Sequence, residues 1–245
     1  MMRTIIALIA TALVAATLSP TAAGQDEGSR QTAKLKFTRK APGKPSGLIF
    51  KVDYVNPDDP AAKPPAVSQV VETLAPGARF DTSAPELCAA SDPELMLLGT
   101  AACPPGSRVA DGVITLDTGF PQPGRFITSP ADFLNNTDEQ IFLNHALATE
   151  TPRVVTRARV TERERIVAAP FLPGTPPDGA ATDTVLVRDF VSKREVGGEL
   201  GSYITTPPNC PKRGYWMNES RFTYFDGVTQ TVETRSPCRR AQRRR

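Results

Sequence analysis

The amino-acid sequence predicts an all-β protein, a β-sandwich or jelly roll of about ten strands with one short helix. Short runs of β-branched and aromatic residues recur along the chain, and turn signals separate them. The 24 prolines and 17 glycines interrupt long regular elements. One segment carries the start signals of a helix.

A hairpin is predicted near the C-terminus. Residues 221–225 and 228–234 are rich in aromatic and β-branched residues, and the dipeptide Asp226-Gly227 separates them. Asp-Gly favours a two-residue hairpin turn because both turn positions need a positive φ. We therefore expect the two runs to pair as antiparallel strands.

Residues 48–54 form the clearest single strand, because large apolar residues alternate there with polar ones. The buried face is predicted to hold Leu48, Phe50, Val52 and Tyr54. The other predicted strands are residues 34–38, 67–74, 112–117, 125–127, 140–147, 153–167 and 182–190. We expect one sandwich domain over residues 34–238; the alternative is two smaller sandwiches divided near residues 172–181, a Pro/Gly-rich loop.

The one predicted helix lies between Cys88 and Cys103. Ser91 or Asp92 can cap its N-terminus, and Pro93 suits the first helical turn. Met96 and Leu97 are interpreted as core contacts of this helix.

The four cysteines are Cys88, Cys103, Cys210 and Cys238. An even number without a C-x-x-C pair favours disulfide bonds over metal binding in an exported protein. Four cysteines allow three pairings, and we favour the local one, which joins Cys88 to Cys103 and Cys210 to Cys238. Each bond is expected to contribute about 3 to 4 kcal/mol on the chain-entropy model.

The N-terminus resembles a secretory signal peptide over residues 1–24. Arg3 is followed by an apolar run at residues 5–18, and small residues offer a cleavage site near Ala23 or Gly24. The apolar run is too short to span a bilayer, although an uncleaved anchor is the alternative. Residues 25–33 are polar and predicted to be disordered. No later stretch is apolar enough to cross a membrane, so we expect a secreted or envelope-associated protein.

The formal net charge is +3, but it is unevenly distributed. Removing Arg3 and the five arginines of the tail, residues 239–245, lowers the basic count from 29 to 23 against 26 acids, a net charge of −3. The tail arginines are Arg239, Arg240, Arg243, Arg244 and Arg245. We interpret the tail as disordered; the alternative is adhesion to anionic envelope polymer or lipid headgroups. Nothing in the chain indicates a nucleic-acid-binding domain.

The sequence lacks the usual catalytic constellations. His145 is the single histidine and no G-x-S-x-G motif occurs, which argues against a serine hydrolase and against zinc. No glycine loop for phosphate occurs either, so we expect neither a cofactor nor a metal. Glu162 and Glu164 are the best carboxylate pair for glycoside hydrolysis, but we favour a solvated strand face. His145 is interpreted as a core residue of its strand.

Tyr215 and Trp216, near the terminal hairpin, form the best candidate recognition surface. Aromatic side chains can stack on a sugar ring or anchor a protein partner. For Trp216 we favour the other interpretation, in which its ring packs in the core under the nearby disulfide.

Two segments resemble a pattern in uncharacterised secreted proteins of actinobacteria. The first runs from Leu74 to Gly112 and holds Cys103-Pro104-Pro105-Gly106-Ser107-Arg108-Val109; the second runs from Tyr203 to Cys238 and holds Thr205-Thr206-Pro207-Pro208-Asn209-Cys210-Pro211. The family pattern usually has glycine after the valine, where this chain has Ala110. The resemblance implies a disulfide-bonded, exported β-sandwich and supplies no activity.

These observations predict a secreted, disulfide-stabilised β-sandwich of the cell envelope or extracellular space with a non-enzymatic binding or structural role. The alternative is a carbohydrate-binding module or a sandwich-fold glycosidase. No protein partner can be named from the sequence.

Overall fold

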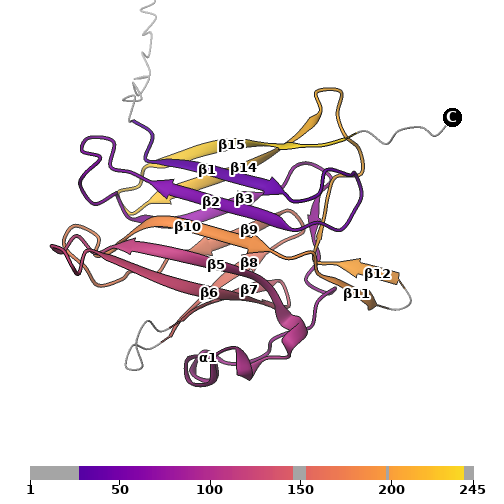
Figure 1. Ribbon diagram of the computed structural model, residues 1–245, viewed down its shortest axis with the longest axis horizontal. Helices are drawn as coiled ribbons and strands as arrows, with labels where there is room; N and C mark the ends of the chain where they lie inside the picture. Colours follow the sequence, from indigo (N-terminus) through magenta and orange to yellow (C-terminus); the bar gives the residue numbers. More distant parts are fainter. Residues whose placement is uncertain (1–27, 146–152, 197–198, 240–245) are drawn as a thin grey trace, which may run out of the picture.

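The computed structural model describes residues 28–145, 153–196 and 199–239, and nearly all of its regular structure is β (Figure 1). Within these residues the strands form one 11-stranded sheet and two small two-stranded sheets. The large sheet contains β1 (Gln31–Phe37), β2 (Leu48–Tyr54), β3 (Val67–Thr73), β5 (Arg108–Asp117), β6 (Phe126–Asn136), β7 (Glu139–Asn144), β8 (Val154–Val160), β9 (Glu164–Ala168), β10 (Ala181–Asp189), β14 (Tyr215–Tyr224) and β15 (Thr229–Pro237). The small sheets pair β4 (Arg79–Phe80) with β13 (Ile204–Thr205) and β11 (Lys193–Val196) with β12 (Glu199–Ser202). The all-β prediction is confirmed.

The large sheet folds back on itself to make two layers. Its strand order is β1-β2-β10-β5-β6-β7-β8-β9-β3-β14-β15, with antiparallel pairing throughout. In Figure 1, β2, β10 and β5 lie in front of β3, β9 and β8. Strands from both ends of the chain therefore enclose one interior.

The two ends of the sheet, β1 at one end and β14 with β15 at the other, meet at a seam held by side chains. The Asn218 amide on β14 donates to the carbonyl of Leu35 on β1 at 2.7 Å. The Ser236 hydroxyl on β15 accepts from the backbone N–H of Phe37 at 3.1 Å. These bonds satisfy backbone groups that an open sheet edge leaves unpaired.

Alternation along the strands places the predicted apolar residues inside. In β2 the inward residues Leu48, Phe50, Val52 and Tyr54 are all buried, as the sequence predicted. Aromatic rings from facing layers meet edge to face, for example Tyr54 and Phe222 with ring centroids 5.9 Å apart. Such pairs contribute about 0.5–1.5 kcal/mol beyond the area they bury.

The predicted helix is confirmed as α1 (Asp92–Leu98), and two 3₁₀ turns, η1 (Gly99–Ala102) and η2 (Pro105–Ser107), follow it. The Glu94 carboxylate accepts from the backbone N–H of Ser91 at 2.8 Å, the return bond of a capping box. Leu95 is the buried residue of the helix, whereas Met96 and Leu97 are 44% and 77% exposed. Their interpretation as core contacts is wrong, because a seven-residue helix presents only one face to the sheet.

The outer face of β6 and β7 is covered by α1. Six buried residues make this contact, which we call the outer cluster: Cys88, Leu95, Cys103, Leu134, Ile141 and Leu143. Arg157 on β8 ties the helix to the sheet, because its guanidinium contacts the carboxylates of Asp92 at 2.8 Å and Glu139 at 2.5 Å.

Several strand boundaries differ from prediction: β6 continues to Asn136 beyond the expected residues 125–127, and β5 and β14 begin earlier than expected, at Arg108 and Tyr215. Two further differences change the course of the chain. Residues 153–167 were expected to form one strand, but the chain reverses after Val160 and makes the β8–β9 hairpin, closed by the Thr161 N–H donating to the Glu164 carbonyl at 2.8 Å. No glycine, proline or asparagine marks that turn. At the other end β1 begins at Gln31, inside the segment predicted to be disordered, because Gln31 is buried and accepts from the Tyr224 hydroxyl.

Candidate functional site

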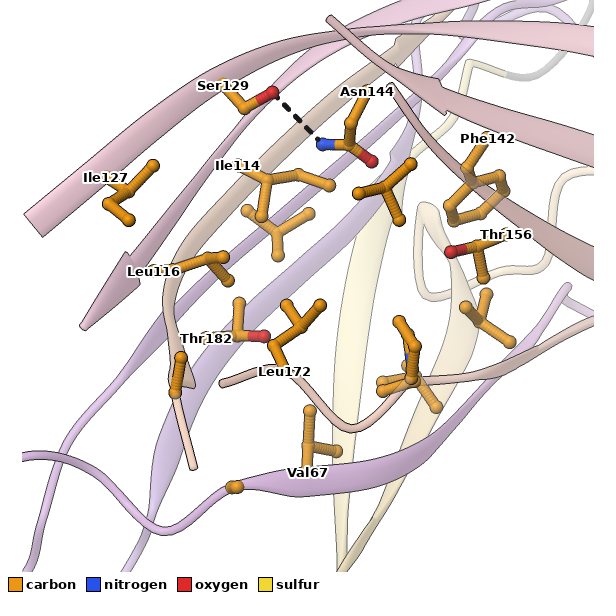
Figure 2. Close-up of a pocket in the computed structure, with 18 of the residues that line it drawn as sticks. Val67, Ile114, Leu116, Ile127, Ser129, Phe142, Asn144, Thr156, Leu172 and Thr182 are labelled. Carbon is orange, nitrogen blue, oxygen red and sulfur yellow. Dashed lines mark hydrogen bonds between the residues drawn. The ribbon is translucent and has the colours of Figure 1, made fainter. Parts of the chain in front are cut away.

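A cavity of about 440 Å³ lies between the two layers of the sheet. Figure 2 shows side chains such as Ile114, Phe142 and Val67 pointing into it from strands far apart in the sequence. Its wall is mostly apolar. Small-molecule sites are typically apolar hollows of roughly 300–1,000 Å³ with a few polar groups, so both size and lining suit a ligand.

The cavity exists because several inward positions carry short side chains. The interior of a sandwich is about 10 Å thick, and only large residues on both layers fill it. Short residues stand at several of these lining positions: Thr118, Ser129, Thr156, Ala169, Ala180 and Thr182. The cavity could not be predicted from the sequence, since small residues at inward positions are informative only when the facing layer is known.

One wall is the Pro/Gly-rich connection between β9 and β10, which contributes Pro170, Leu172 and Pro173. The Lys63 ammonium holds this loop by donating to three of its carbonyls: Thr175 at 2.5 Å, Pro177 at 2.8 Å and Gly179 at 2.6 Å. A loop tied at three points gives the cavity a preformed wall.

The mouth is marked by lining residues that also reach solvent. Phe225, at the turn between β14 and β15, is 43% exposed, and Ile127 on β6 is 39% exposed. These side chains leave an apolar rim at the end where β14 turns into β15 and β6 begins.

A buried polar group, which we call the charge cluster, consists of Glu72, Gln140, Arg165 and Asp189. On β3, Val67 pairs with Tyr224 beside Phe225 of the rim, and Glu72 lies farther along the same strand, so we call its end of the cavity the deep end. The Arg165 guanidinium is fully buried and donates to the Glu72 carboxylate at 2.7 Å, and to the Asp189 carboxylate and the Gln140 amide oxygen at 2.8 Å each. Arg165 and Glu72 are register partners on β9 and β3, whereas Asp189 comes from β10 in the other layer. Among the four, Glu72 lines the cavity itself.

The charge cluster holds two carboxyl groups against one guanidinium. Burial raises the pKa of Glu72, and the charge and hydrogen bonds of Arg165 oppose this rise only in part. One carboxylate oxygen of Asp189 and the Tyr203 hydroxyl are buried without a hydrogen-bond partner in the described part of the chain. Burial also raises the pKa of Tyr203, which keeps its hydroxyl protonated.

A second polar place lies on the β6–β7 wall. The Asn144 amide donates to the Ser129 hydroxyl at 3.4 Å (Figure 2), and neighbouring His145 contacts Asp132 at 2.6 Å. The side chain of His145 is 46% exposed. The interpretation of His145 as a core residue is wrong, because β7 ends at Asn144 and His145 lies beyond the alternating pattern.

The predicted disulfide pairing is confirmed: Cys88 bonds to Cys103 and Cys210 bonds to Cys238. Two such bonds fit a non-cytoplasmic, oxidising compartment. Neither bond touches the cavity wall, so both act on the framework around the site.

The predicted recognition pair is divided between core and surface. Trp216 is only 2% exposed, its ring packs edge to face on Phe37, and its indole N–H donates to the Asn209 carbonyl at 2.7 Å. Tyr215 is half-buried, with the guanidinium groups of Arg213 and Arg235 each 4.9 Å from its ring centre. Trp216 is thus a core residue, and only Tyr215 of the pair reaches the surface.

Within residues 28–145, 153–196 and 199–239, no group of three or more His, Cys, Asp or Glu side chains is placed to hold a metal ion. None of the helices in that part of the chain is long and apolar enough to cross a membrane.

Comparison with protein-family models found no match to this chain, and comparison with curated proteins found none either. The geometry and chemistry of the cavity are therefore the basis for proposing a function.

Proposed function

We propose that this chain is a secreted, non-enzymatic protein of the cell envelope or extracellular space that binds an apolar small molecule inside its β-sandwich. The observation that carries the proposal is the cavity of about 440 Å³ with its apolar wall and polar deep end. The signal-like N-terminus and the two disulfide bonds support export.

The size of the cavity supports occupancy. Protein interiors pack to near-crystalline density, and unfilled volume costs about 24 cal/mol per Å³. A wholly enclosed, empty cavity of this size corresponds to about 10 kcal/mol, an upper bound here because the rim reaches solvent. Domain stabilities are about 5–15 kcal/mol, so a bound apolar molecule that restores packing contacts stabilises the fold substantially.

The positions of the acids support binding over glycoside hydrolysis. Hydrolysis needs two carboxyl groups on opposite sides of an accessible sugar. Glu72 and Asp189 instead share one guanidinium and are 2% and 4% exposed. Glu162, the first residue of the other candidate pair, lies in the β8–β9 turn. A carbohydrate-binding role has less support, because Trp216 is packed in the core.

Attachment to the envelope through the tail belongs to the same proposal. The last seven residues contain five arginines, and such a cluster is attracted to anionic wall polymer or lipid headgroups. Sedimentation with envelope fractions, comparing full-length protein with a form ending at Cys238, tests this: binding lost in high salt supports electrostatic attachment.

Binding in the cavity is tested by titration with the neutral, apolar fluorophore N-phenyl-1-naphthylamine. Wild-type protein is expected to enhance its fluorescence saturably. Ile114→Trp fills the cavity from β5 and is expected to abolish the enhancement. The matched control is Val113→Trp, one residue away on the same strand but 37% exposed and outside the cavity wall, and it is expected to bind normally.

Circular dichroism and thermal melting establish that both variants fold. Binding by Ile114→Trp equal to that of Val113→Trp, or no saturable binding by wild-type protein, contradicts the proposal.

A further inference from the structure

Negative and positive charge are unequal among the described side chains that line the cavity. No lysine or arginine is among the described side chains that line the wall. Glu72 is the acid among them, and His145 at the wall is already paired with Asp132. A ligand carboxylate or phosphate therefore meets no free positive charge inside, while it meets the Glu72 carboxylate at the deep end.

The Glu72 carboxylate retains hydrogen-bonding capacity. Arg165 donates one bond to each of its two oxygens, at 3.2 and 2.7 Å. A carboxylate offers about four lone-pair positions, so roughly half remain for another donor. Since Glu72 is 2% exposed, bulk water does not satisfy them.

The charge cluster needs a further donor for a second reason. Its two carboxyl groups share one guanidinium, and one oxygen of Asp189 is buried without a partner among the described residues. A buried group with excess negative charge is stabilised by a hydrogen-bond donor or a cation and destabilised by a further anion.

We infer that the ligand is an apolar molecule with a hydroxyl or amino group at its deep end, which donates a hydrogen bond to Glu72, and that the cavity rejects a carboxylate of the same length. This inference rests on the proposed binding function. In the competing orientation, the polar group of the ligand lies at the Ser129–Asn144 pair. Those two side chains are neutral and already bond to each other, so they would not distinguish an alcohol from a carboxylate by charge.

The inference is tested with four twelve-carbon competitors that displace N-phenyl-1-naphthylamine from the native protein at pH 7: dodecan-1-ol, dodecylamine, dodecane and dodecanoate. The alcohol and the amine are expected to bind at least about tenfold more tightly than dodecanoate, and dodecane is expected to bind with intermediate affinity. The reason is that a hydrogen bond to a charged group strengthens binding by about that factor or more. Dodecanoate that binds as tightly as the alcohol overturns the inference.

Glu72→Gln assigns the effect to the residue. It removes the negative charge while keeping the shape, and it is expected to bring dodecanoate within a few-fold of dodecan-1-ol. The control is Asp53→Asn, which removes an acid from the outward part of β2, 47% exposed beside Lys51, and is expected to leave the order unchanged. If Glu72→Gln does not fold, the order measured on the native protein decides alone.

The two proposals fail differently. Equal displacement by all four competitors overturns the polar anchor and leaves apolar binding intact. Absence of fluorophore binding overturns the proposed function and the inference with it.

Discussion

The two faces of β6 and β7 contact two cores of different construction. On the outer face, Leu134, Ile141 and Leu143 meet α1 in the outer cluster, whose members are all buried. On the inner face, Phe133 and Phe142 meet the opposite layer and leave a cavity beside them. The same strands therefore support a filled core and a hollow one.

The difference follows from what covers each face. The covering helix is short and belongs to a chain segment closed by a disulfide across 15 residues, so it can settle onto the sheet until contact is complete. The opposite layer belongs to the same continuous sheet, and facing β layers lie about 10 Å apart, so unfilled volume persists where the inward side chains are short. The space between the two layers can thus remain hollow and bind a ligand, whereas a docked helix fills the space on the outer face.

The largest effect is expected from removing the positive charge of the charge cluster in the inner core. Arg165→Met leaves Glu72 and Asp189 without their cation in a buried site, and we expect a loss of about 3–5 kcal/mol in the free energy of unfolding. Urea denaturation measures it. Replacing all three ionic residues by apolar ones of similar size should recover most of the loss; a change under about 1 kcal/mol for Arg165→Met contradicts the account of the cluster.

The second largest effect on stability is expected from removing the disulfide bond of the outer cluster. Cys88→Ala combined with Cys103→Ala removes the constraint on a 15-residue loop and is expected to cost about 3 kcal/mol. Fluorophore binding measured below the unfolding transition should be unchanged, because the bond lies on the other face of the sheet. Loss of binding in a folded double variant shows that the two cores are coupled and that the comparison fails.

The smallest effect is a pH dependence that belongs to the inner core. Burial, opposed in part by Arg165, raises the pKa of Glu72 in the folded protein above its unfolded value. Its contribution to stability is then fully present below the unfolded pKa of about 4.3 and is lost as pH rises through the folded pKa.

Urea denaturation at intervals from pH 4 to 8 measures this dependence. The free energy of unfolding of wild-type protein, minus that of Glu72→Gln, should fall as pH rises. Asp226 on the surface is expected to act in the opposite direction: burial raises its pKa, but hydrogen bonds from Arg30 and the Val228 backbone outweigh this and lower it. A Glu72 difference that stays flat or rises with pH contradicts the sign derived for the inner core.

Most of the framework could be predicted because its signals are local. Alternation in residues 48–54, the hairpin around Asp226-Gly227 and the helix between Cys88 and Cys103 each depend on neighbours along the chain, and all three are present in the structure. The hairpin turn itself differs from prediction, because only Gly227 of the two turn residues has a positive φ. The wrong predictions concern places where the local sequence pattern carries no signal. Position 145 looked like a continuation of β7, and residues 153–167 looked like one strand, because nothing in the sequence marks the strand end or the reversal.

The candidate site could not be predicted because its members meet only across layers. Arg165 lies 93 residues from Glu72 in the sequence and 24 from Asp189, and the alternating charges around it read as a solvated strand face. For Trp216 the sequence favoured core packing, and the structure agrees, but the partner that buries its ring could not be named, since β1 comes from the other end of the chain.

The sequence by itself determined the alternation of residues 48–54, the hairpin around Asp226-Gly227, the helix between Cys88 and Cys103 and the favoured local pairing of the cysteines. Only the tertiary structure decided which inward positions face one another. The physical reason is that the space between facing layers is filled by side chains from both, so whether it is packed, hollow or charged depends on their sum. The cavity and the charge cluster at its deep end are properties of that sum.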